Sequence, residues 1–147
     1  MQMTSELAVR KSVTVAASPE RAFELFTAGV ATWWPLSTHS VGKENAETVV
    51  IEPHVGGRFY ERTVDGDEHD WGTVTAWEPP GLFACTWHPG NDPAQAQDLE
   101  LRFLPEGEGT RVELVHTGWE RRADGAEAVK DYEQGWEIVL GTFAAAG

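Results

Sequence analysis

Two polar side chains and a group of aromatic ones could line an internal site in this sequence. Alternation along the predicted strands places Glu61 and His116 on inward faces. A carboxyl group in apolar surroundings can act as an acid or a base, and an imidazole among aromatic rings can orient a carbonyl or move a proton. The aromatic candidates are Trp33, Trp34, Phe59, Trp71, Trp87, Tyr132 and Trp136. We predict that these residues line a ligand cavity.

Glu61 could form a carboxylate pair with Glu52 on a neighbouring strand, in which a carboxyl of raised pKa acts as an acid or a base. Each candidate also has an interpretation without a ligand. Either carboxylate could instead pair with an arginine at the rim, such as Arg58 or Arg111. His116 could be a core histidine with satisfied hydrogen bonds, and the aromatic side chains could fill an ordinary core as well as wall a planar ligand. The residue pattern leaves these alternatives open.

The residue spacing does not favour metal binding or nucleophilic catalysis. The five histidines stand 15, 15, 19 and 28 positions apart, so none has the H-x-x-x-H spacing that puts two ligands on one helix face. The single cysteine, Cys85, lies mid-strand without a basic neighbour, which is typical of a buried structural thiol. We expect no metal site and no cofactor, and we assign no catalytic residue.

A strand, a helix and a loop are the first elements that would position these residues. Alternation predicts a strand from Leu7 to Val15. Ser18-Pro19-Glu20 is a helix start, with a capping serine, a proline at the first helical position and an acid near the positive end of the helix dipole. A second short helix ends at Trp33-Trp34-Pro35. With the polar stretch from Leu36 to Ala46, it is predicted to form a movable lip at the cavity entrance.

Six further strands are predicted between turn signals such as Gly-Gly, Asp-Gly and Pro-Pro-Gly, at the spacing of a meander. The strand around Trp71 is ambiguous, because Trp71 and Trp77 share one face whereas Val74 occupies the other. The predicted ranges are Thr48 to Pro53, Arg58 to Val64, His69 to Trp77, Leu82 to Trp87, Asp98 to Leu104 and Thr110 to Thr117.

The end of the chain changes to a helical period. From Ala126 onward, one face of a helix carries Val129, Tyr132, Trp136, Val139, Leu140 and Phe143. This helix is the only long amphipathic element, so it must cover the apolar face of the sheet. The sequence therefore predicts an α+β fold in which a curved antiparallel sheet wraps around a long C-terminal helix.

A series of short motifs along the chain resembles a known superfamily. They are Ser18-Pro19-Glu20-Arg21-Ala22-Phe23, Trp33-Trp34-Pro35, Glu52-Pro53, Val55-Gly56-Gly57-Arg58-Phe59, Trp71-Gly72-Thr73-Val74, Glu78-Pro79-Pro80, Phe83 through Trp87, Thr110-Arg111-Val112 and Gly135-Trp136. Their order and spacing are similar to those of the START-like (SRPBCC, Bet v 1-like helix-grip) domains. Within these, they resemble the branch related to the C-terminal domain of the Hsp90 ATPase activator Aha1.

The resemblance implies a single helix-grip domain over residues 1–147, with about seven strands and a cavity between sheet and helix. It implies binding of a small hydrophobic or aromatic molecule, because members of the superfamily bind lipids, sterols and polyketides. One alternative is an enzyme of the polyketide cyclase or dehydratase type. Another is a chaperone- or stress-related interaction module, which is less favoured because the two-domain Hsp90 activator is longer than this chain.

The charge of the chain excludes some classes of binding partner. A net charge of −13 argues against nucleic acid and anionic membranes, since both require a basic face. The first residues lack the charged and apolar regions of a secretory signal, and no apolar run is long enough to span a membrane, so we expect a cytoplasmic protein. The chain could form a homodimer, which the sequence does not decide.

Overall fold

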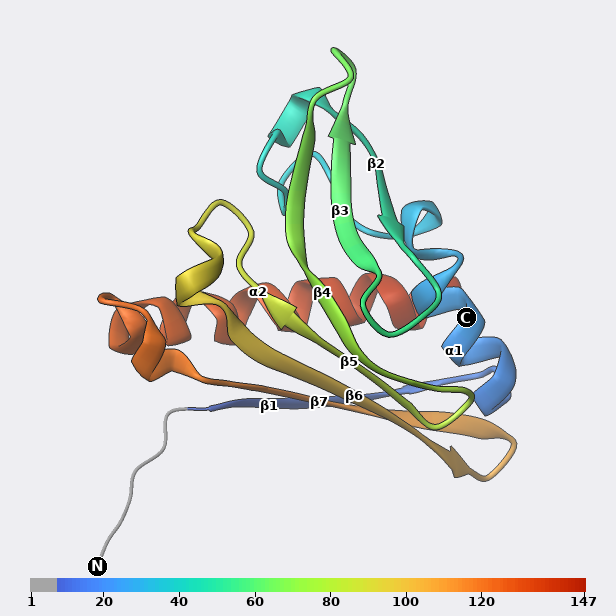
Figure 1. Ribbon diagram of the computed structural model, residues 1–147. Helices are drawn as coiled ribbons and strands as arrows, with labels where there is room; N and C mark the ends of the chain where they lie inside the picture. The colour runs from blue at the N-terminus through green and yellow to red at the C-terminus, as the bar shows by residue number, and fades with distance from the viewer. Residues whose placement is uncertain (1–7) are drawn as a thin grey trace, which may run out of the picture.

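The computed structural model describes residues 8–147. Seven strands form one antiparallel sheet in the order β1-β7-β6-β5-β4-β3-β2. The sheet curls around the C-terminal helix α2 (Gly125–Ala146), which crosses its concave face (Figure 1). The strands are β1 (Val9–Val15), β2 (Ala46–Ile51), β3 (Arg58–Thr63), β4 (Glu68–Glu78), β5 (Leu82–Trp87), β6 (Gln97–Glu106) and β7 (Gly109–Thr117). The predicted helix-grip fold is confirmed.

The segment between the first two strands begins as predicted and then departs from prediction. Helix α1 (Pro19–Thr27) starts where the Ser18 hydroxyl accepts a hydrogen bond from the Arg21 amide at 3.2 Å. The second predicted helix is a 3₁₀ turn, η1 (Val30–Thr32), which ends before Trp33 and Trp34. Leu7, the predicted start of the first strand, lies outside the described residues. Three more 3₁₀ turns are η2 (Lys43–Asn45), η3 (Pro93–Gln95) and η4 (Trp119–Arg121).

The meander prediction is correct from β2 to β7, and β1 completes the sheet at its other edge. β1 pairs with β7 in a register that runs from Val9 opposite His116 to Val15 opposite Thr110. The first strand of the chain therefore lies beside the last. No helix among residues 8–147 is long and apolar enough to cross a membrane.

Irregular pairing of β4 explains why its inward face could not be read from the sequence. Trp71 and Val74 are both buried, although residues three apart point to opposite faces of a regular strand. The register of β4 shifts once against β3 and once against β5, and each shift changes the face to which the following side chains point. As a result Thr73 is exposed, and Trp77 is half-buried against Phe23 with ring centroids 5.1 Å apart.

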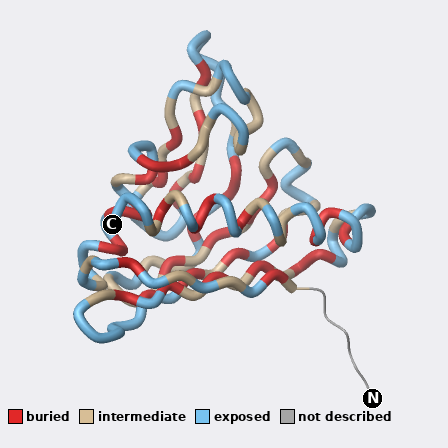
Figure 2. The backbone as a smooth tube through the Cα atoms, turned by 180° about the vertical axis from the view of Figure 1, so that it is seen from behind, coloured by how far each residue is buried: buried red, intermediate tan, exposed pale blue. Residues whose placement is uncertain are grey.

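The core lies between the concave face of the sheet and α2. Figure 2 shows buried segments alternating with exposed ones along the strands and along the helix, as expected for elements with one covered face. The inward faces predicted from strand phase are buried, at Phe59, Glu61, Thr63, Phe83, Cys85, Trp87, Leu99, Leu101, Phe103, Val112, Leu114 and His116. The helix contributes Trp136, Val139, Leu140 and Phe143.

Candidate functional site

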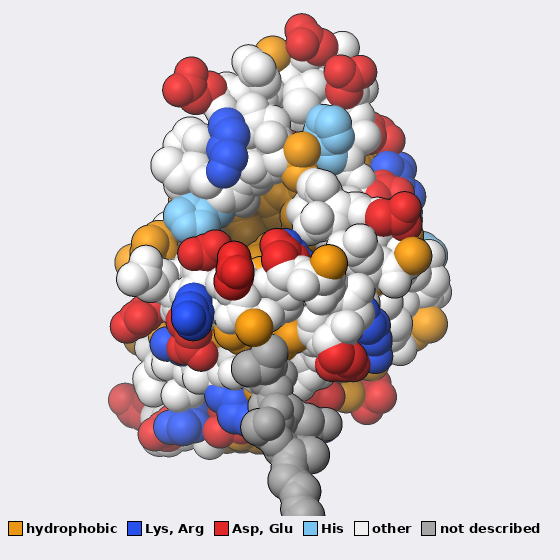
Figure 3. Space-filling view, turned by 90° about the vertical axis from the view of Figure 1, so that its left-hand side faces the viewer, with side chains coloured by type: hydrophobic (Ala, Val, Ile, Leu, Met, Phe, Trp, Pro, Cys, Tyr) orange, Lys and Arg blue, Asp and Glu red, His pale blue; other side chains and the backbone are white. Residues whose placement is uncertain are grey.

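A pocket of about 520 Å³ lies between α2, the turn after β5 and the loop over residues 36–46, here called the lip loop. In Figure 3 a hollow with hydrophobic side chains inside it opens at the surface, bordered by basic, acidic and histidine side chains. The pocket is lined by Trp34, Thr38, His39, Ser40, Val41, Lys43, Trp71, Trp87, Pro89, Gly90, Asp131, Tyr132, Gly135, Trp136 and Val139. The lip loop therefore forms one side of the mouth and α2 the other.

Aromatic side chains from four separate elements form the walls. Trp34 follows η1, Trp71 lies on β4, Trp87 on β5, and both Tyr132 and Trp136 lie on α2. The ring centroids of Trp34 and Trp71 are 5.1 Å apart, as are those of Trp87 and Trp136. Rings packed at these distances hold one another in place. These five of the predicted cavity residues line the pocket.

Two other predicted aromatic residues lie behind the pocket wall. The Trp33 indole N–H donates to the Leu25 carbonyl at 2.8 Å, and its ring packs on Phe143 with centroids 5.0 Å apart. Phe59 lies 5.3 Å from Trp71 and 5.6 Å from Trp87, ring to ring. Trp33 and Phe59 support the lining residues, so their predicted contact with a ligand does not follow from this geometry.

Glu61 is fully buried, and both of its carboxylate oxygens accept hydrogen bonds from N–H groups. Oε1 accepts from the Trp71 indole at 2.7 Å and from the Val41 amide at 2.6 Å, and Oε2 accepts from the Gly42 amide at 2.8 Å. A carboxylate with three such donors is well satisfied without a cation. Glu61 thus joins a wall tryptophan to the lip loop and does not itself line the pocket.

The paired-carboxylate hypothesis and its arginine alternative both fail for Glu61. Glu52 accepts a hydrogen bond from the backbone N–H of Arg58 at 2.7 Å, whereas the partners of Glu61 are those of the lip loop and Trp71. The Arg58 guanidinium instead bonds Asp70 at 2.6 Å. Glu61 needs neither a second carboxylate nor an arginine, because the lip loop, distant in sequence, supplies hydrogen-bond donors to its buried carboxylate.

The lip loop is tied to the body by a set of hydrogen bonds besides those to Glu61. The Trp34 indole N–H donates to the His39 carbonyl at 2.7 Å, and the Ser40 hydroxyl donates to the Leu36 carbonyl at 2.6 Å. A Cβ on Gly42 would lie 3.0 Å from Glu61 Oε2, so glycine permits the close approach of loop and carboxylate. The loop borders the pocket as predicted, and it is held there at several points.

His116 is a buried histidine with two hydrogen-bond partners. Its Nδ1 accepts from the Trp136 indole N–H at 3.0 Å, which leaves the ring proton on Nε2, 3.3 Å from Gln97 Oε1. Burial, with a smaller contribution from Arg122, lowers the pKa of His116 to about 3. His116 therefore stays neutral and positions Trp136 from behind. It does not meet Glu61 at the pocket, which the enzyme hypothesis required.

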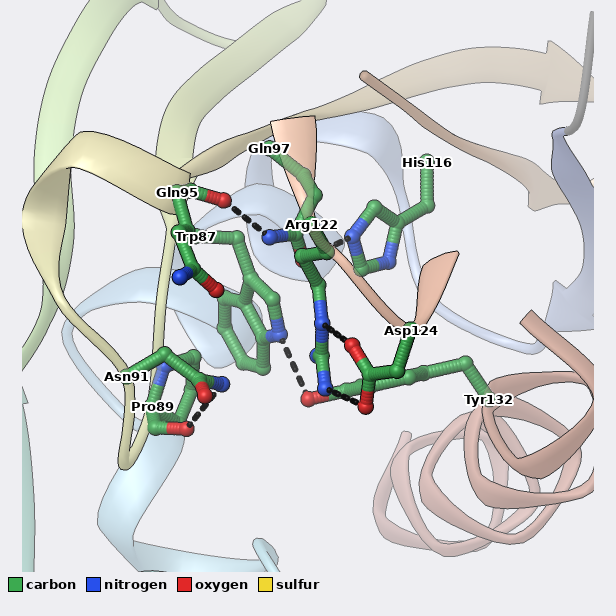
Figure 4. Close-up of polar contacts among 9 residues, drawn as sticks. All are labelled: Trp87, Pro89, Asn91, Gln95, Gln97, His116, Arg122, Asp124 and Tyr132. Atoms are coloured by element: carbon green, nitrogen blue, oxygen red, sulfur yellow. Dashed lines mark hydrogen bonds and ion pairs between the residues drawn. The ribbon is translucent and has the colours of Figure 1, made fainter. Parts of the chain in front are cut away.

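Tyr132 is the pocket residue whose hydroxyl faces both a tryptophan and an ion pair (Figure 4). The Trp87 indole donates to the Tyr132 oxygen at 3.1 Å, and the guanidinium of Arg122, bound to Asp124 at 2.8 Å, lies beside it. Burial raises the pKa of the Tyr132 phenol, so it keeps its proton at neutral pH. Since Trp87 uses the oxygen as an acceptor, the phenolic proton is left for a separate acceptor.

The pocket mouth carries polar residues that were not singled out from the sequence. Thr38, His39 and Lys43 come from the lip loop, and Asp131 comes from α2. In the sequence, Thr38, His39 and Lys43 are marked only by their place in a polar loop without a regular pattern. Burial, followed by the charge of Lys43, lowers the pKa of His39.

Neither metal nor thiol chemistry has a visible basis among residues 8–147. No three His, Cys, Asp or Glu side chains in this part of the chain are grouped as metal ligands would be. Cys85 is buried, and burial raises the pKa of its thiol. A thiol held in its protonated form is a packing group and a weak nucleophile.

Comparison with known proteins identifies relatives over nearly the whole chain. A family model described as activator of Hsp90 ATPase homolog 1-like protein matches residues 16–146. The structure of the anthrahydroquino-gamma-pyrone synthase Txn09, complexed with SUM, has 39% sequence identity and a TM-score of 0.66, and the match covers 97% of this chain and 99% of that chain. No match was found among curated protein sequences.

Two further solved structures share the fold at lower identity. The Aha1 dimer from Colwellia psychrerythraea has 18% identity and a TM-score of 0.68, covering 95% of this chain and 94% of that chain. DynU16, from the dynemicin biosynthetic locus, has 19% identity and a TM-score of 0.71, covering 96% of this chain and 47% of that chain. These likenesses support the fold alone.

Proposed function

Because this chain belongs to the activator of Hsp90 ATPase homolog 1-like family, whose fold is typical of ligand binding, we propose that its pocket binds a small planar aromatic molecule. One observation carries the proposal, namely an open pocket of about 520 Å³ walled by four tryptophans and a tyrosine. Small-molecule pockets usually measure about 300–1,000 Å³ and combine apolar walls with a few directed polar groups. The pocket has these properties.

The identity of the polar groups suggests that the ligand carries a carbonyl. Tyr132 has a phenolic proton to donate, and its oxygen is held by Trp87 at 3.1 Å. A flat carbonyl compound lying against Trp87 and Trp136 would place an acceptor near that proton. Such a ligand would gain aromatic contact area and one directed hydrogen bond.

An enzymatic role is the second candidate, and it rests on the relative with 39% identity. That protein is described as an anthrahydroquino-gamma-pyrone synthase, a name that indicates an enzyme whose product contains a pyrone. The present pocket is of a kind that could hold a related compound. We therefore keep a cyclase- or dehydratase-type reaction as the alternative to binding alone.

A chaperone-related interaction has less support in this molecule. Among residues 8–147 the exposed large hydrophobic side chains are Val55, Val64, Leu104 and Ile138, which come from four different elements or turns. A protein-binding face would gather such side chains into one patch. A homodimer, known for the Aha1 protein from Colwellia psychrerythraea, remains a prediction for this chain.

Binding of 9,10-anthraquinone tests the proposal. We expect it to quench tryptophan fluorescence saturably, because the wall tryptophans line the pocket. Tyr132→Phe should weaken binding about fivefold, since one neutral hydrogen bond contributes about 1 kcal/mol. Anthracene, which has the same shape but no carbonyl, should bind both proteins equally.

Trp77→Phe provides the matched control, because Trp77 is half-buried outside the pocket lining and packs on Phe23. It should leave the affinity for anthraquinone unchanged. An absence of saturable quenching by either compound would contradict the proposed function. Equal loss of anthracene and anthraquinone binding in Tyr132→Phe would contradict the hydrogen bond.

A further inference from the structure

The mouth of the pocket is electrostatically asymmetric. The titratable side chains that line the pocket are His39 and Lys43 on the lip loop and Asp131 and Tyr132 on α2, while the turn after β5 contributes only Pro89 and Gly90. A lysine and a histidine therefore face the opening from one side, in a chain whose net charge is −13. The cation of the pocket lining is thus on the lip loop side, and the carboxylate of Asp131 is on the α2 side.

His39 is arranged so that one ring nitrogen is available to accept a proton. Its Nδ1 lies 2.7 Å from the Thr38 hydroxyl, and that hydroxyl is directed at the Pro35 carbonyl at 3.4 Å. A neutral imidazole has one unprotonated ring nitrogen, and in the tautomer in which Nδ1–H donates to the Thr38 oxygen that nitrogen is Nε2. The contact with Thr38 permits this tautomer, in which Nε2 is a base.

Lys43 is held in place by an unusual backbone conformation. Its φ of 52° lies in the left-handed region, and among the described residues it is the only non-glycine with a positive φ. Its ammonium donates to the Thr38 carbonyl at 3.1 Å, and within residues 8–147 no carboxylate oxygen lies within 4.0 Å of it. Strained backbone at such a position is often retained for function. Lys43 thus presents a cation without an ionic partner beside His39.

The backbone that carries these two side chains is fixed to the pocket wall. The Trp34 indole holds the His39 carbonyl at 2.7 Å, and Glu61 holds the amides of Val41 and Gly42. These hydrogen bonds hold the lip loop, which carries His39 and Lys43, against the pocket wall.

We propose that the mouth of this pocket is a site for an ionisable hydroxyl, a phenol or an enol, on the aromatic ligand: His39 accepts the proton of this hydroxyl and Lys43 stabilises the oxyanion. The inference rests on the proposed function, since it presupposes that the pocket binds an aromatic molecule. In the step itself the ligand O–H bond breaks and an N–H bond forms at His39 Nε2. The electron pair stays on the ligand oxygen beside the Lys43 ammonium, and no further reactant is needed.

The electrostatic properties of the pocket mouth fit this role. Burial and the neighbouring Lys43 charge lower the pKa of His39, so the imidazole is neutral at pH 7 and able to accept a proton. An anionic ligand oxygen would offset the effect of Lys43 and stabilise the imidazolium. Asp131, on the α2 side, opposes an anion and so restricts the oxyanion to the lip loop side.

The test compares 2-hydroxyanthraquinone, whose phenol ionises near neutral pH with a change of colour, with 9,10-anthraquinone, which has the same rings and no hydroxyl. We expect the protein to lower the ionisation midpoint of bound 2-hydroxyanthraquinone by about one pH unit, a tenfold effect. Lys43→Met should remove most of this shift, and Asp131→Asn should increase it. The affinity of each variant for 9,10-anthraquinone is measured beside the shift, so that a loss of pocket binding is distinguished from a loss of ionisation.

The number of protons released to the buffer on binding shows whether His39 accepts the phenolic proton. Isothermal titration calorimetry at pH 7 in buffers of different ionisation enthalpy should show the bound phenolate forming with almost no proton released to the buffer, because His39 retains it. His39→Gln should either release close to one proton on binding or leave the probe un-ionised.

The outcomes separate the two proposals. A bound probe that remains un-ionised, or an ionised one that releases a full proton from the parent protein, would overturn the inference while the pocket still binds 9,10-anthraquinone. If neither compound binds, the proposed function fails, and this inference fails with it.

Discussion

Glu61→Gln is expected to lower the free energy of unfolding by about 3 kcal/mol. The side chain is fully buried, and its two oxygens accept from the Val41 and Gly42 amides and the Trp71 indole. An amide of the same shape must turn its NH₂ group toward at least one of these donors. Each hydrogen bond to a charged group contributes about 1.5–3 kcal/mol, and the bonds that survive become neutral ones. Urea denaturation at pH 7.5 measures the difference.

Glu52→Gln is the matched control. Glu52 is only partly buried, and its carboxylate accepts from one backbone amide, that of Arg58 at 2.7 Å. This substitution should lower the free energy of unfolding by less than about 1 kcal/mol. Glu61→Gln should also make the lip loop more susceptible to limited proteolysis, because two of its anchors are affected. Equal stability losses in both variants, with unchanged proteolysis, would show that Glu61 does not hold the loop.

The stability of the protein should fall by about 2 kcal/mol between pH 7.5 and pH 5 through His116 alone. The folded state lowers the pKa of His116 to about 3, whereas an unfolded histidine titrates near 6.5. Below pH 6.5 the unfolded state therefore binds a proton that the folded state does not, so stability is lost as the pH falls. pH 5 lies about 1.5 units below the pKa of histidine in the unfolded state. Each unit corresponds to about 1.4 kcal/mol, which gives a loss of about 2 kcal/mol.

His116→Phe isolates this contribution from that of other groups. The ring can still pack on Trp119, whose centroid lies 4.1 Å away, but the Trp136 indole loses its acceptor, so the variant should be less stable at pH 7.5. Its stability should nevertheless depend less on pH than that of the parent by about 2 kcal/mol over the same interval. His54→Gln, at an exposed position, should keep the full dependence. An identical pH profile in parent and His116→Phe would contradict the assignment.

Much of the fold was predictable because its signals are local. Ser18 and Pro19 start α1 through contacts within one turn of the chain. The strands are bounded by glycine- and proline-containing turns, and alternation correctly placed side chains such as Phe83 and Leu101 on the buried face. Periods of two and of 3.6 follow from backbone geometry, so they can be read from neighbouring residues.

The predictions that failed or stayed ambiguous depend on pairing between distant segments. The inward face of β4 changes at bulges that only the register with β3 and β5 defines. The hypothesis that Glu61 pairs with another carboxylate or an arginine was wrong because the lip loop, 19 and 20 positions away, supplies its donors. Trp33 and Phe59 share the aromatic character of the pocket residues, but they lie one layer deeper.

Local patterns along the chain were enough to predict that a curved sheet encloses an amphipathic helix, and that the enclosed surface is rich in tryptophan. Turn residues and hydrophobic periodicity act over a few positions, so these properties do not depend on the rest of the chain. Which aromatic rings line the pocket, and that His39, Lys43 and Asp131 line it with them, became known from the folded arrangement. The physical reason is that a binding site is a set of distances between segments remote in sequence, and these distances are set by strand register, by the helix packed across the sheet and by one buried carboxylate.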